Sequence, residues 1–216
     1  SVTQTSGIYN SKDVLTATSV STNLGSGDFT ANAGTLLSNY LLPTSVTATG
    51  SAITAKTLTA SLSDQHKAYD GTTTAALSAN SIAVSGFVAG EGASITQTVG
   101  TYNSANVVSA SSVSAALTSA NFTADTGTTL SNYTLPTSAS GSGTITPVTV
   151  SLSASKNYDG STALSGNQVT IGNLVSGESL SYSGATLNNK NVLGASYINA
   201  ITLADSGSTL ASNYAL

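Results

Sequence analysis

Two short segments combine residue types that could grip a ligand: Lys67-Ala68-Tyr69-Asp70-Gly71-Thr72 and Lys156-Asn157-Tyr158-Asp159-Gly160-Ser161. A tyrosine ring can stack on a sugar and an aspartate can accept hydrogen bonds from sugar hydroxyls, so each Tyr-Asp pair is a candidate glycan site. The same residues suit a tight turn, because Gly takes a positive φ without steric cost and Asp bonds nearby backbone N–H groups. We favour the turn, since one Tyr and one Asp in each segment are thin support for a binding site.

A covalent Lys–Asn isopeptide cross-link is a second kind of chemistry that the residue types permit. It needs a buried Lys on an early strand, an Asn on a late strand and a carboxylic acid between them. Lys67, Asn132 and either Glu91 or Asp125 supply those types. Because Lys67 lies beside a turn and Asn132 has a simpler structural role, we do not expect the cross-link. An exposed ion pair between this Lys and a neighbouring Asp would contribute only about 0–1 kcal/mol.

The residue types in the sequence give little support for catalysis or metal binding. His66 is the only histidine and the chain has no cysteine, whereas a Ser-His-Asp triad or a zinc site needs more ligands or bases. The aspartates form no Asp-x-Asp run of the kind that binds calcium, and there is no P-loop or dinucleotide fingerprint. We therefore expect no catalytic residue, no cofactor, no metal ligand and no enzyme activity. A mixed calcium site at a junction between modules stays open as an alternative.

The composition narrows the class of protein further. With 39% hydrophobic residues and a net charge of −4, the chain lacks the low hydrophobicity and high charge of disordered segments. Five scattered lysines without any arginine disfavour nucleic-acid binding, which needs clustered cations. No apolar run reaches the length of a membrane span. Low charge together with abundant Ser and Thr is typical of a secreted surface fibre.

The chain contains an internal repeat. Residues 1–43 recur at residues 94–136 without a gap, and about 60% of the aligned positions are identical, which marks a repeat protein. An Asn-Tyr pair recurs in all copies, as Asn39-Tyr40, Asn132-Tyr133 and Asn213-Tyr214. We interpret this Tyr as a core anchor of the last strand with its hydroxyl satisfied at the edge, and the Asn as closing the preceding turn.

The repeat divides the chain into three parts. Residues 1–55 are the C-terminal half of a unit, residues 56–146 a complete unit, and residues 147–216 a unit lacking its last strand. Leu58, Ala60 and Leu62 alternate with polar residues, as in a half-buried strand. We find no convincing helix, and each unit contains roughly six to eight short strands joined by turns. The predicted fold class is all-β: tandem small antiparallel β-sandwich-like modules of about 90 residues, stacked end to end. The out-of-phase ends suggest a cut from a longer array, or ends that complement each other between molecules.

The recurring motifs carry a family resemblance. Lys-x-Tyr-Asp-Gly-(Ser/Thr) near the start of a unit, Gly-Glu in the middle and Asn-Tyr-x-Leu near the end resemble the YDG-type repeat. This repeat and its MBG relatives occur in tandem in very large bacterial surface proteins, notably filamentous-haemagglutinin-like adhesins exported by two-partner secretion. The chain departs from the usual pattern at Tyr102-Asn103-Ser104-Ala105-Asn106-Val107, where Asn-Val-Gly is more typical.

The resemblance implies a stalk or fibre segment of an extracellular bacterial adhesin or biofilm-matrix filament. The expected location is the bacterial cell surface, and the expected partners are neighbouring repeats of the same or identical chains. One alternative is a glycan-binding β module, which requires a cluster of exposed tyrosines. Another is a self-assembling filament subunit in which one molecule supplies a strand that its neighbour lacks.

Overall fold

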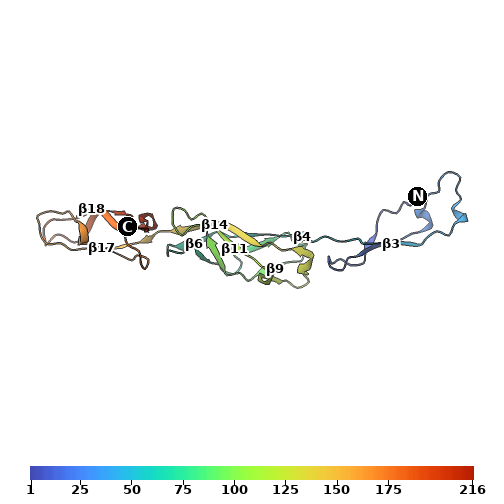
Figure 1. Cartoon of the computed structure of the whole chain (residues 1–216), viewed down its shortest axis with the longest axis horizontal. Coiled ribbons are helices and arrows are strands. Elements are labelled where there is room, and N and C mark those ends of the chain that lie inside the picture. Colours follow the sequence, from blue (N-terminus) through green and yellow to red (C-terminus); the bar gives the residue numbers. More distant parts are fainter. The chain divides into compact units, whose positions relative to one another are not determined.

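The computed structural model describes residues 1–216 and is all-β, with helical residues only in short 3-10 turns (Figure 1). These turns are η1 (Ser26–Asp28), η2 (Leu37–Asn39), η3 (Ser119–Asn121), η4 (Leu130–Asn132), η5 (Gly166–Gln168) and η6 (Ala211–Asn213). The chain forms two compact units. The first comprises residues 1–59, 84–94 and 122–136, and the second comprises residues 60–83, 95–121 and 137–216.

An open three-stranded antiparallel sheet makes up the N-terminal part of the first unit. Its strands are β1 (Ile8–Tyr9), β2 (Ser19–Asn23) and β3 (Ser45–Thr49), with β2 in the centre. This sheet has little core, and Tyr9 is 40% exposed, whereas its repeat counterpart Tyr102 is 3% exposed. β10, which carries Tyr102, pairs with both β7 and β11, whereas β1 pairs with β2 alone.

The rest of the first unit consists of two short strand pairs. β4 (Lys56–Thr57) pairs in parallel with β13 (Tyr133–Thr134), and β9 (Ala93–Ile95) pairs with β12 (Phe122–Ala124). The parallel pair continues into Leu58, whose N–H donates to the carbonyl of Thr134 and whose side chain is buried. The Asn132-Tyr133 pair therefore lies where η4 ends and β13 begins.

A curled, half-barrel sheet of seven strands is the main element of the second unit. Its strand order is β7-β10-β11-β14-β5-β8, and β6 also pairs with β14. The bounds are β5 Thr59–Leu62, β6 Gln65–Ala68, β7 Thr74–Ala76, β8 Ile82–Ser85, β10 Val99–Tyr102, β11 Ser112–Ala116 and β14 Ser138–Thr146. The long strand β14 is antiparallel to β11 but parallel to β5 and β6.

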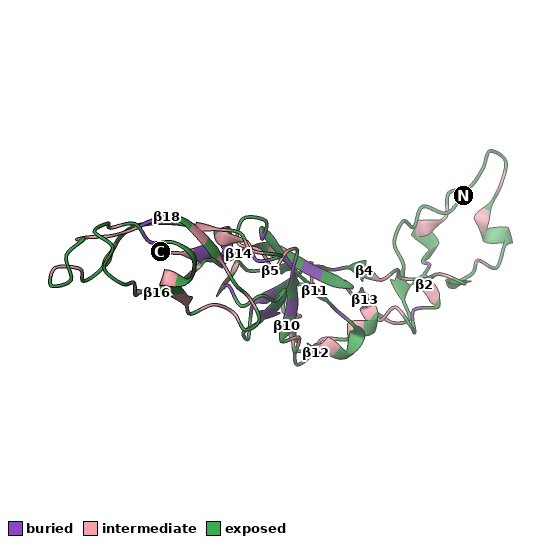
Figure 2. Ribbon diagram, turned by 60° about the vertical axis from the view of Figure 1, so that its left-hand side comes forward, coloured by how far each residue is buried: buried purple, intermediate pink, exposed green.

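The core of this sheet follows from strict alternation along its strands. On β11, Val113 and Ala115 are buried while the residues between them face solvent. Buried residues also gather on β10 and β14 (Figure 2). A Cβ at Gly141 would lie 2.1 Å from the carbonyl oxygen of Leu62, so only glycine lets β5 approach β14 where the sheet curls.

Residues 147–216 add three strand pairs to the second unit. β15 (Val148–Thr149) is parallel to β20 (Tyr214–Ala215); β16 (Ser151–Ala154) is antiparallel to β17 (Val169–Gly172), and β18 (Ser181–Leu187) to β19 (Ile198–Ala204). Leu164, Val169 and Ala185 form a small core against which partly buried apolar residues pack. The β15–β20 pair repeats the β4–β13 pairing of the preceding copy.

The all-β prediction is confirmed, and two details of it need correction. The main sheet is mixed and not purely antiparallel, because alternation fixes which face of a strand is buried but not its partner or direction. Eleven strands, β4 to β14, fall within residues 56–146, more than predicted, since several are only two or three residues long. The predicted tandem sandwich arrangement is not confirmed. No helix here has the length and hydropathy to cross a membrane.

Candidate functional site

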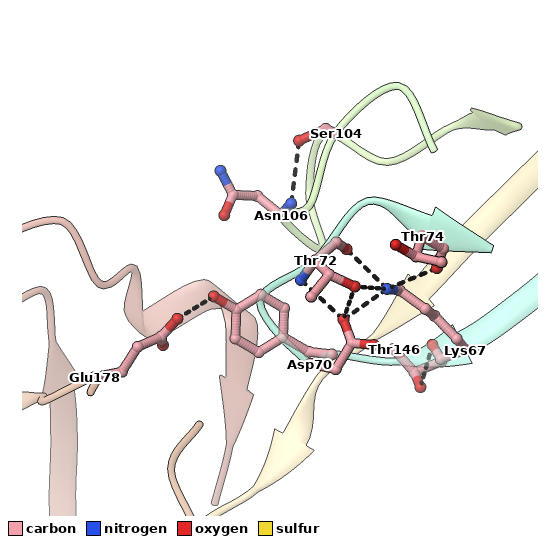
Figure 3. Close-up of polar contacts among 9 residues, drawn as sticks. Lys67, Asp70, Thr72, Thr74, Ser104, Asn106, Thr146 and Glu178 are labelled. Carbon is pink, nitrogen blue, oxygen red and sulfur yellow. Dashed lines mark hydrogen bonds and ion pairs between the residues drawn. The ribbon is translucent and has the colours of Figure 1, made fainter. Parts of the chain in front are cut away.

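A half-buried lysine, Lys67, organises the first Tyr-Asp-Gly segment into a turn. Lys67 Nζ donates to Asp70 Oδ1 at 2.6 Å and to the backbone carbonyls of Thr72 and Thr74 at 2.7 and 3.1 Å (Figure 3). The same carboxylate oxygen accepts from the backbone N–H and the hydroxyl of Thr72, both at 2.9 Å. Gly71 takes a φ of +76°, which closes the turn. All three ammonium donor positions thus have protein acceptors, which leaves this lysine unavailable to a ligand.

The second copy of the turn repeats these contacts. Lys156 Nζ lies 2.7 Å from Asp159 Oδ1 and donates to the carbonyl of Ala163 at 2.8 Å. Ser161 replaces Thr72 and donates its N–H to Asp159 at 2.9 Å. The Lys156 hydrogen bond and that backbone N–H lower the pKa of Asp159 to about 2. At Asp70, burial would raise the pKa, but the hydrogen bonds from Lys67 and Thr72 outweigh it and the pKa is lowered.

One carboxylate joins two tyrosines of the recurring motifs. Tyr69, of the first Tyr-Asp-Gly turn, donates to Glu178 Oε1 at 2.6 Å (Figure 3). Tyr214, of the last Asn-Tyr pair, donates to Oε2 of the same carboxylate at 2.7 Å. The two rings pack edge to face with their centroids 5.5 Å apart. Burial and the hydrogen bond to Glu178 raise the pKa of Tyr69 to about 12 and also raise that of Tyr214. The phenol of Tyr214 accepts a further hydrogen bond from the N–H of Val175.

The first unit contains the equivalent arrangement around Tyr133. Its hydroxyl donates to Glu91 Oε2 at 2.5 Å and accepts from the N–H of Val88 at 3.1 Å. The hydrogen bond to Glu91, with burial, raises the pKa of Tyr133. Phe87 packs edge to face against the ring at 4.9 Å. Glu91 therefore holds one phenol, whereas its counterpart Glu178 holds two.

The asparagine of the Asn-Tyr motif bonds a loop far away in sequence. Asn132 Oδ1 accepts from the N–H of Val14 at 2.8 Å, and its Nδ2 donates to Asp13 Oδ1 at 2.8 Å. In the next copy, Asn213 accepts from the N–H of Val107 at 2.9 Å and donates to Asn106 Oδ1 at 3.0 Å. Asp13 and Val14 correspond to Asn106 and Val107 in the repeat alignment. The same pair of hydrogen bonds, from the asparagine of an Asn-Tyr pair to a loop of the preceding copy, is thus made twice with equivalent residues. We call this pair of hydrogen bonds the clasp.

The loop that the clasp binds is held in shape by hydrogen bonds of its own. Asn103 Oδ1 accepts from the N–H groups of Ser111 and Ser112, and its Nδ2 donates to the carbonyl of Ser109. This fixes the loop that carries Asn106, whose own N–H bonds the hydroxyl of Ser104 (Figure 3). Asn10 and Asn188 make the corresponding contacts in the other copies. The Asn-rich central segment that departs from the family pattern is therefore the receiving side of the clasp.

The candidate site residues of the sequence thus divide into two groups. The joints between successive copies are formed by Tyr69, Asn132, Asn213 and Tyr214, whereas Tyr133 bonds Glu91 of its own copy. Asp70, Gly71, Asp159 and Gly160 belong to the turns. Tyr158 and the Asn39-Tyr40 pair are exposed. Sequence reasoning missed the part played by Asp13, Val14, Asn106, Val107 and Glu178. An asparagine stands three residues before the receiving position in every copy, and this recurrence was a signal that the loop has a fixed shape: Asn10 before Asp13, Asn103 before Asn106 and Asn188 before Asn191.

The remaining candidates have separate structural explanations. The residues considered for an isopeptide bond each hydrogen-bond a different partner. Lys67 bonds Asp70, Glu91 bonds Tyr133 and Asn132 bonds Asp13. His66 is largely exposed, with Nδ1 2.7 Å from the Thr144 hydroxyl. No three His, Asp or Glu side chains are grouped so that they could hold a metal ion.

Comparison with known proteins supports one part of the resemblance. A family model described as the YDG domain matches residues 54–141, which covers all but the last five residues of the complete unit. No curated protein and no solved structure matches the chain. The chain is therefore similar to YDG-domain proteins over this segment, and the YDG part of the predicted resemblance is confirmed.

Proposed function

We propose that the chain is a structural segment of a tandem-repeat stalk, in which successive copies are joined by hydrogen bonds between their recurring motifs. The observation that carries this proposal is the duplicated joint: Asn132 with Asp13 and Val14, and Asn213 with Asn106 and Val107. A repeat whose recurring residues bind the neighbouring copy, and not a ligand, is suited to length and stiffness. Stability in such an array is a sum of terms from the units and from their interfaces.

An extracellular bacterial setting is part of the same proposal. The match of residues 54–141 to the YDG domain fits the resemblance to repeats of large surface adhesins. The scarcity of charge, with 6% charged residues, together with abundant Ser and Thr, suits a secreted surface fibre. In this setting the stalk would hold an adhesive region away from the cell.

Stiffness of the joint is the property to test. The chain has no cysteine, so spin labels can be attached at Ala120→Cys and Asn167→Cys, two exposed positions in successive copies. Electron–electron resonance should give one narrow distance distribution, and Asn213→Ala combined with Glu178→Gln should broaden it. Asn191→Ala, in the corresponding loop of the last copy, should leave the width unchanged. A broad distribution in the otherwise unmodified chain would contradict a stiff stalk.

Glycan binding is the second candidate, and one observation favours it. Tyr158 and Tyr197, both largely exposed, line a cleft of about 470 Å³ together with Lys156 and Lys190. Aromatic rings beside a cation are suited to an acidic sugar, and Lys190 is the cation concerned because Lys156 is already bonded within its turn. The motif tyrosines Tyr69, Tyr133 and Tyr214 are buried, however, so the platform is small. A glycan array without signal above that of Tyr158→Ala would exclude this candidate.

A further inference from the structure

The only histidine of the chain lies beside an aspartate on the exposed face of the main sheet. Asp64 immediately precedes β6, and His66 lies within that strand. The Nε2 atom of His66 and the Oδ2 atom of Asp64 are 3.3 Å apart. The two side chains are 62% and 52% exposed, respectively, so dissolved ions can reach both. Neither side chain takes part in the turns or in the joints described above.

Two hydroxyl groups on the neighbouring strand orient this pair. β6 pairs with β14, and the register places His66 opposite Thr144. The Thr144 hydroxyl lies 2.7 Å from Nδ1 of His66, and the Ser142 hydroxyl donates to Oδ1 of Asp64 at 2.7 Å. With the ring proton on Nδ1, His66 donates to Thr144 and its Nε2 lone pair is free. Each side chain is therefore held through one atom, which leaves Nε2 and Oδ2 available to a ligand.

This arrangement has the geometry of one half of a zinc site. Zinc takes four ligands in a tetrahedron at about 2.0–2.2 Å, so two of its N or O ligand atoms lie roughly 3.3–3.5 Å apart. The distance of 3.3 Å between His66 Nε2 and Asp64 Oδ2 falls within that range. Metal-binding histidines and carboxylates are themselves held by hydrogen bonds of the kind that Thr144 and Ser142 provide. The pair is therefore already arranged to bind zinc through two atoms.

One chain supplies only two of the four ligands. No third His, Asp or Glu side chain is grouped with this pair. The last copy of the repeat has no equivalent pair: between a matched Leu and Lys, the complete unit reads Ser-Asp-Gln-His and the last copy reads Ser-Ala-Ser. The other two ligands must therefore come from outside the chain.

The surface around the pair is open to a second protein molecule. The outward residues of β14 beside it, Ser142, Thr144 and Thr146, are exposed, and Ser112 of β11 lies opposite Ser142. These side chains are short and uncharged, so they neither block nor repel an approaching copy. The chain has a net charge of −4, so two copies repel each other, and a dication between two Asp64 carboxylates offsets that repulsion.

We propose that one zinc ion joins two copies of this chain through Asp64 and His66 of each copy. Nε2 and Oδ2 of both copies fill the four tetrahedral positions, and the two carboxylates balance the charge of the ion. Any proton on Nε2 is released when the metal binds. The same two residues act on both sides, so the contact is isologous and closes at a dimer. The proposed stalk function does not require this contact, which would link two stalks.

The single histidine makes binding at this site directly observable. In the 216-residue chain produced without a histidine tag, zinc should shift the ring resonances of His66 in NMR spectra, with saturation at one zinc for two chains. Sedimentation should show the mass doubling as zinc is added and returning to that of the monomer with EDTA. Cobalt in place of zinc should give the strong visible absorption of a tetrahedral site, which a six-coordinate surface ion lacks.

Variants separate the ligands from the residues that orient them. His66→Ala and Asp64→Ala should each abolish the zinc-dependent dimer. Thr144→Val and Ser142→Ala remove only orienting hydroxyl groups, so they should weaken the zinc affinity by about 10- to 100-fold while the circular dichroism spectrum stays unchanged. Asp125→Ala, at an exposed carboxylate elsewhere in the complete unit, should dimerise with zinc like the unmodified chain.

Three results would each overturn the proposal. The first is a His66 ring whose resonances do not move in excess zinc. The second is a zinc-bound chain that stays monomeric at every protein concentration, and the third is a zinc-dependent dimer that persists in His66→Ala. None of these results bears on the internal joint, which the spin labels measure without zinc, so the two proposals fail separately.

Discussion

The phenol of Tyr69 donates a hydrogen bond of 2.6 Å to Glu178, a residue 109 positions further along the chain. The other oxygen of that carboxylate accepts from Tyr214 at 2.7 Å. The three residues belong to the three motifs that recur in the sequence, Tyr-Asp-Gly, Gly-Glu and Asn-Tyr. The motifs therefore meet one another across two copies of the repeat and do not form three separate sites.

Glu178→Gln should destabilise the second unit. A glutamine retains one uncharged acceptor oxygen, so one of the two phenols keeps only a neutral acceptor and the other loses its acceptor. Hydrogen bonds to charged groups contribute about 1.5–3 kcal/mol, and the loss should fall in or below that range. Urea unfolding followed by tyrosine fluorescence measures the change in the free energy of unfolding.

Glu91→Gln is the matched control for this substitution. Glu91 holds only Tyr133, and a glutamine oxygen can keep accepting that single bond. We expect a smaller loss of stability than for Glu178→Gln. Equal losses for the two variants would contradict the idea that sharing one carboxylate between two phenols strengthens the joint.

Replacing Asn132 and Asn213 by aspartate should destabilise the protein to different extents, because the side chains that face them differ in charge. Asn132→Asp places a carboxylate against Asp13, whose side chain accepts a hydrogen bond from Asn132, so two like charges meet at neutral pH. Asn213→Asp faces Asn106, which can rotate its amide to donate. Thermal unfolding at pH 7 should show the larger drop in Tm for Asn132→Asp. The difference should shrink near pH 3, and a difference that does not change with pH would rule out charge repulsion as its cause.

The sequence predicts much of this local structure. The alternation of Leu58, Ala60 and Leu62 with polar residues predicted a strand. The structure has this strand as β5, directly after Leu58, and both Leu58 and Leu62 are buried. The Asp-Gly pairs indicated turns, and both glycines have a φ near that of a left-handed residue. These features depend on residues close together in sequence, where side-chain chemistry limits the backbone directly.

The long-range pairings were not predictable in the same way. The side chain of Asn132 was expected to close its own turn, yet it bonds Asp13 and Val14, 119 and 118 residues away. The donor in one of these bonds is a backbone N–H, which every residue except proline carries, so no residue type marks it. The parallel pairing of β14 with β5 and β6 was hidden for the same reason, because alternation does not specify a partner strand.

Alkaline pH should weaken the second unit through Tyr69. Its pKa is raised from 10.0 to about 12 by burial and by Glu178, so the folded chain keeps a proton that the unfolded chain releases. The stabilising effect is fully present below about pH 10 and is lost as the pH rises toward 12. Urea midpoints measured across this range should fall, and Tyr69→Phe should make the fall shallower. Tyr158→Phe, at an exposed phenol, should leave the slope as in the unmodified chain.

Acid should weaken the second Tyr-Asp-Gly turn by protonating Asp159. The pKa of Asp159 is lowered from 3.8 to about 2 by its hydrogen bonds with Lys156 and Ser161. The folded carboxylate therefore resists protonation, and its contribution to stability is present above about pH 4 and is lost as the pH falls toward 2. Carbon-13 NMR titration of the carboxyl groups measures this directly. Asp159→Asn should remove that part of the acid dependence, and an Asp159 titrating near 4 would contradict the Lys-centred turn.

Alanine at the two turn glycines should measure the packing across the joint. Gly71 and Gly160 have φ values of +76° and +75°, so the backbone penalty of about 1–2 kcal/mol for a left-handed alanine is common to both. A methyl at Gly71 would in addition lie 3.2 Å from Val175, across the joint, while at Gly160 it would meet nothing within 4 Å. Gly71→Ala should therefore lose more stability in urea unfolding than Gly160→Ala. The excess should vanish when Val175→Ala removes the facing methyls, and an excess that persists in the double variant would place its origin inside the turn.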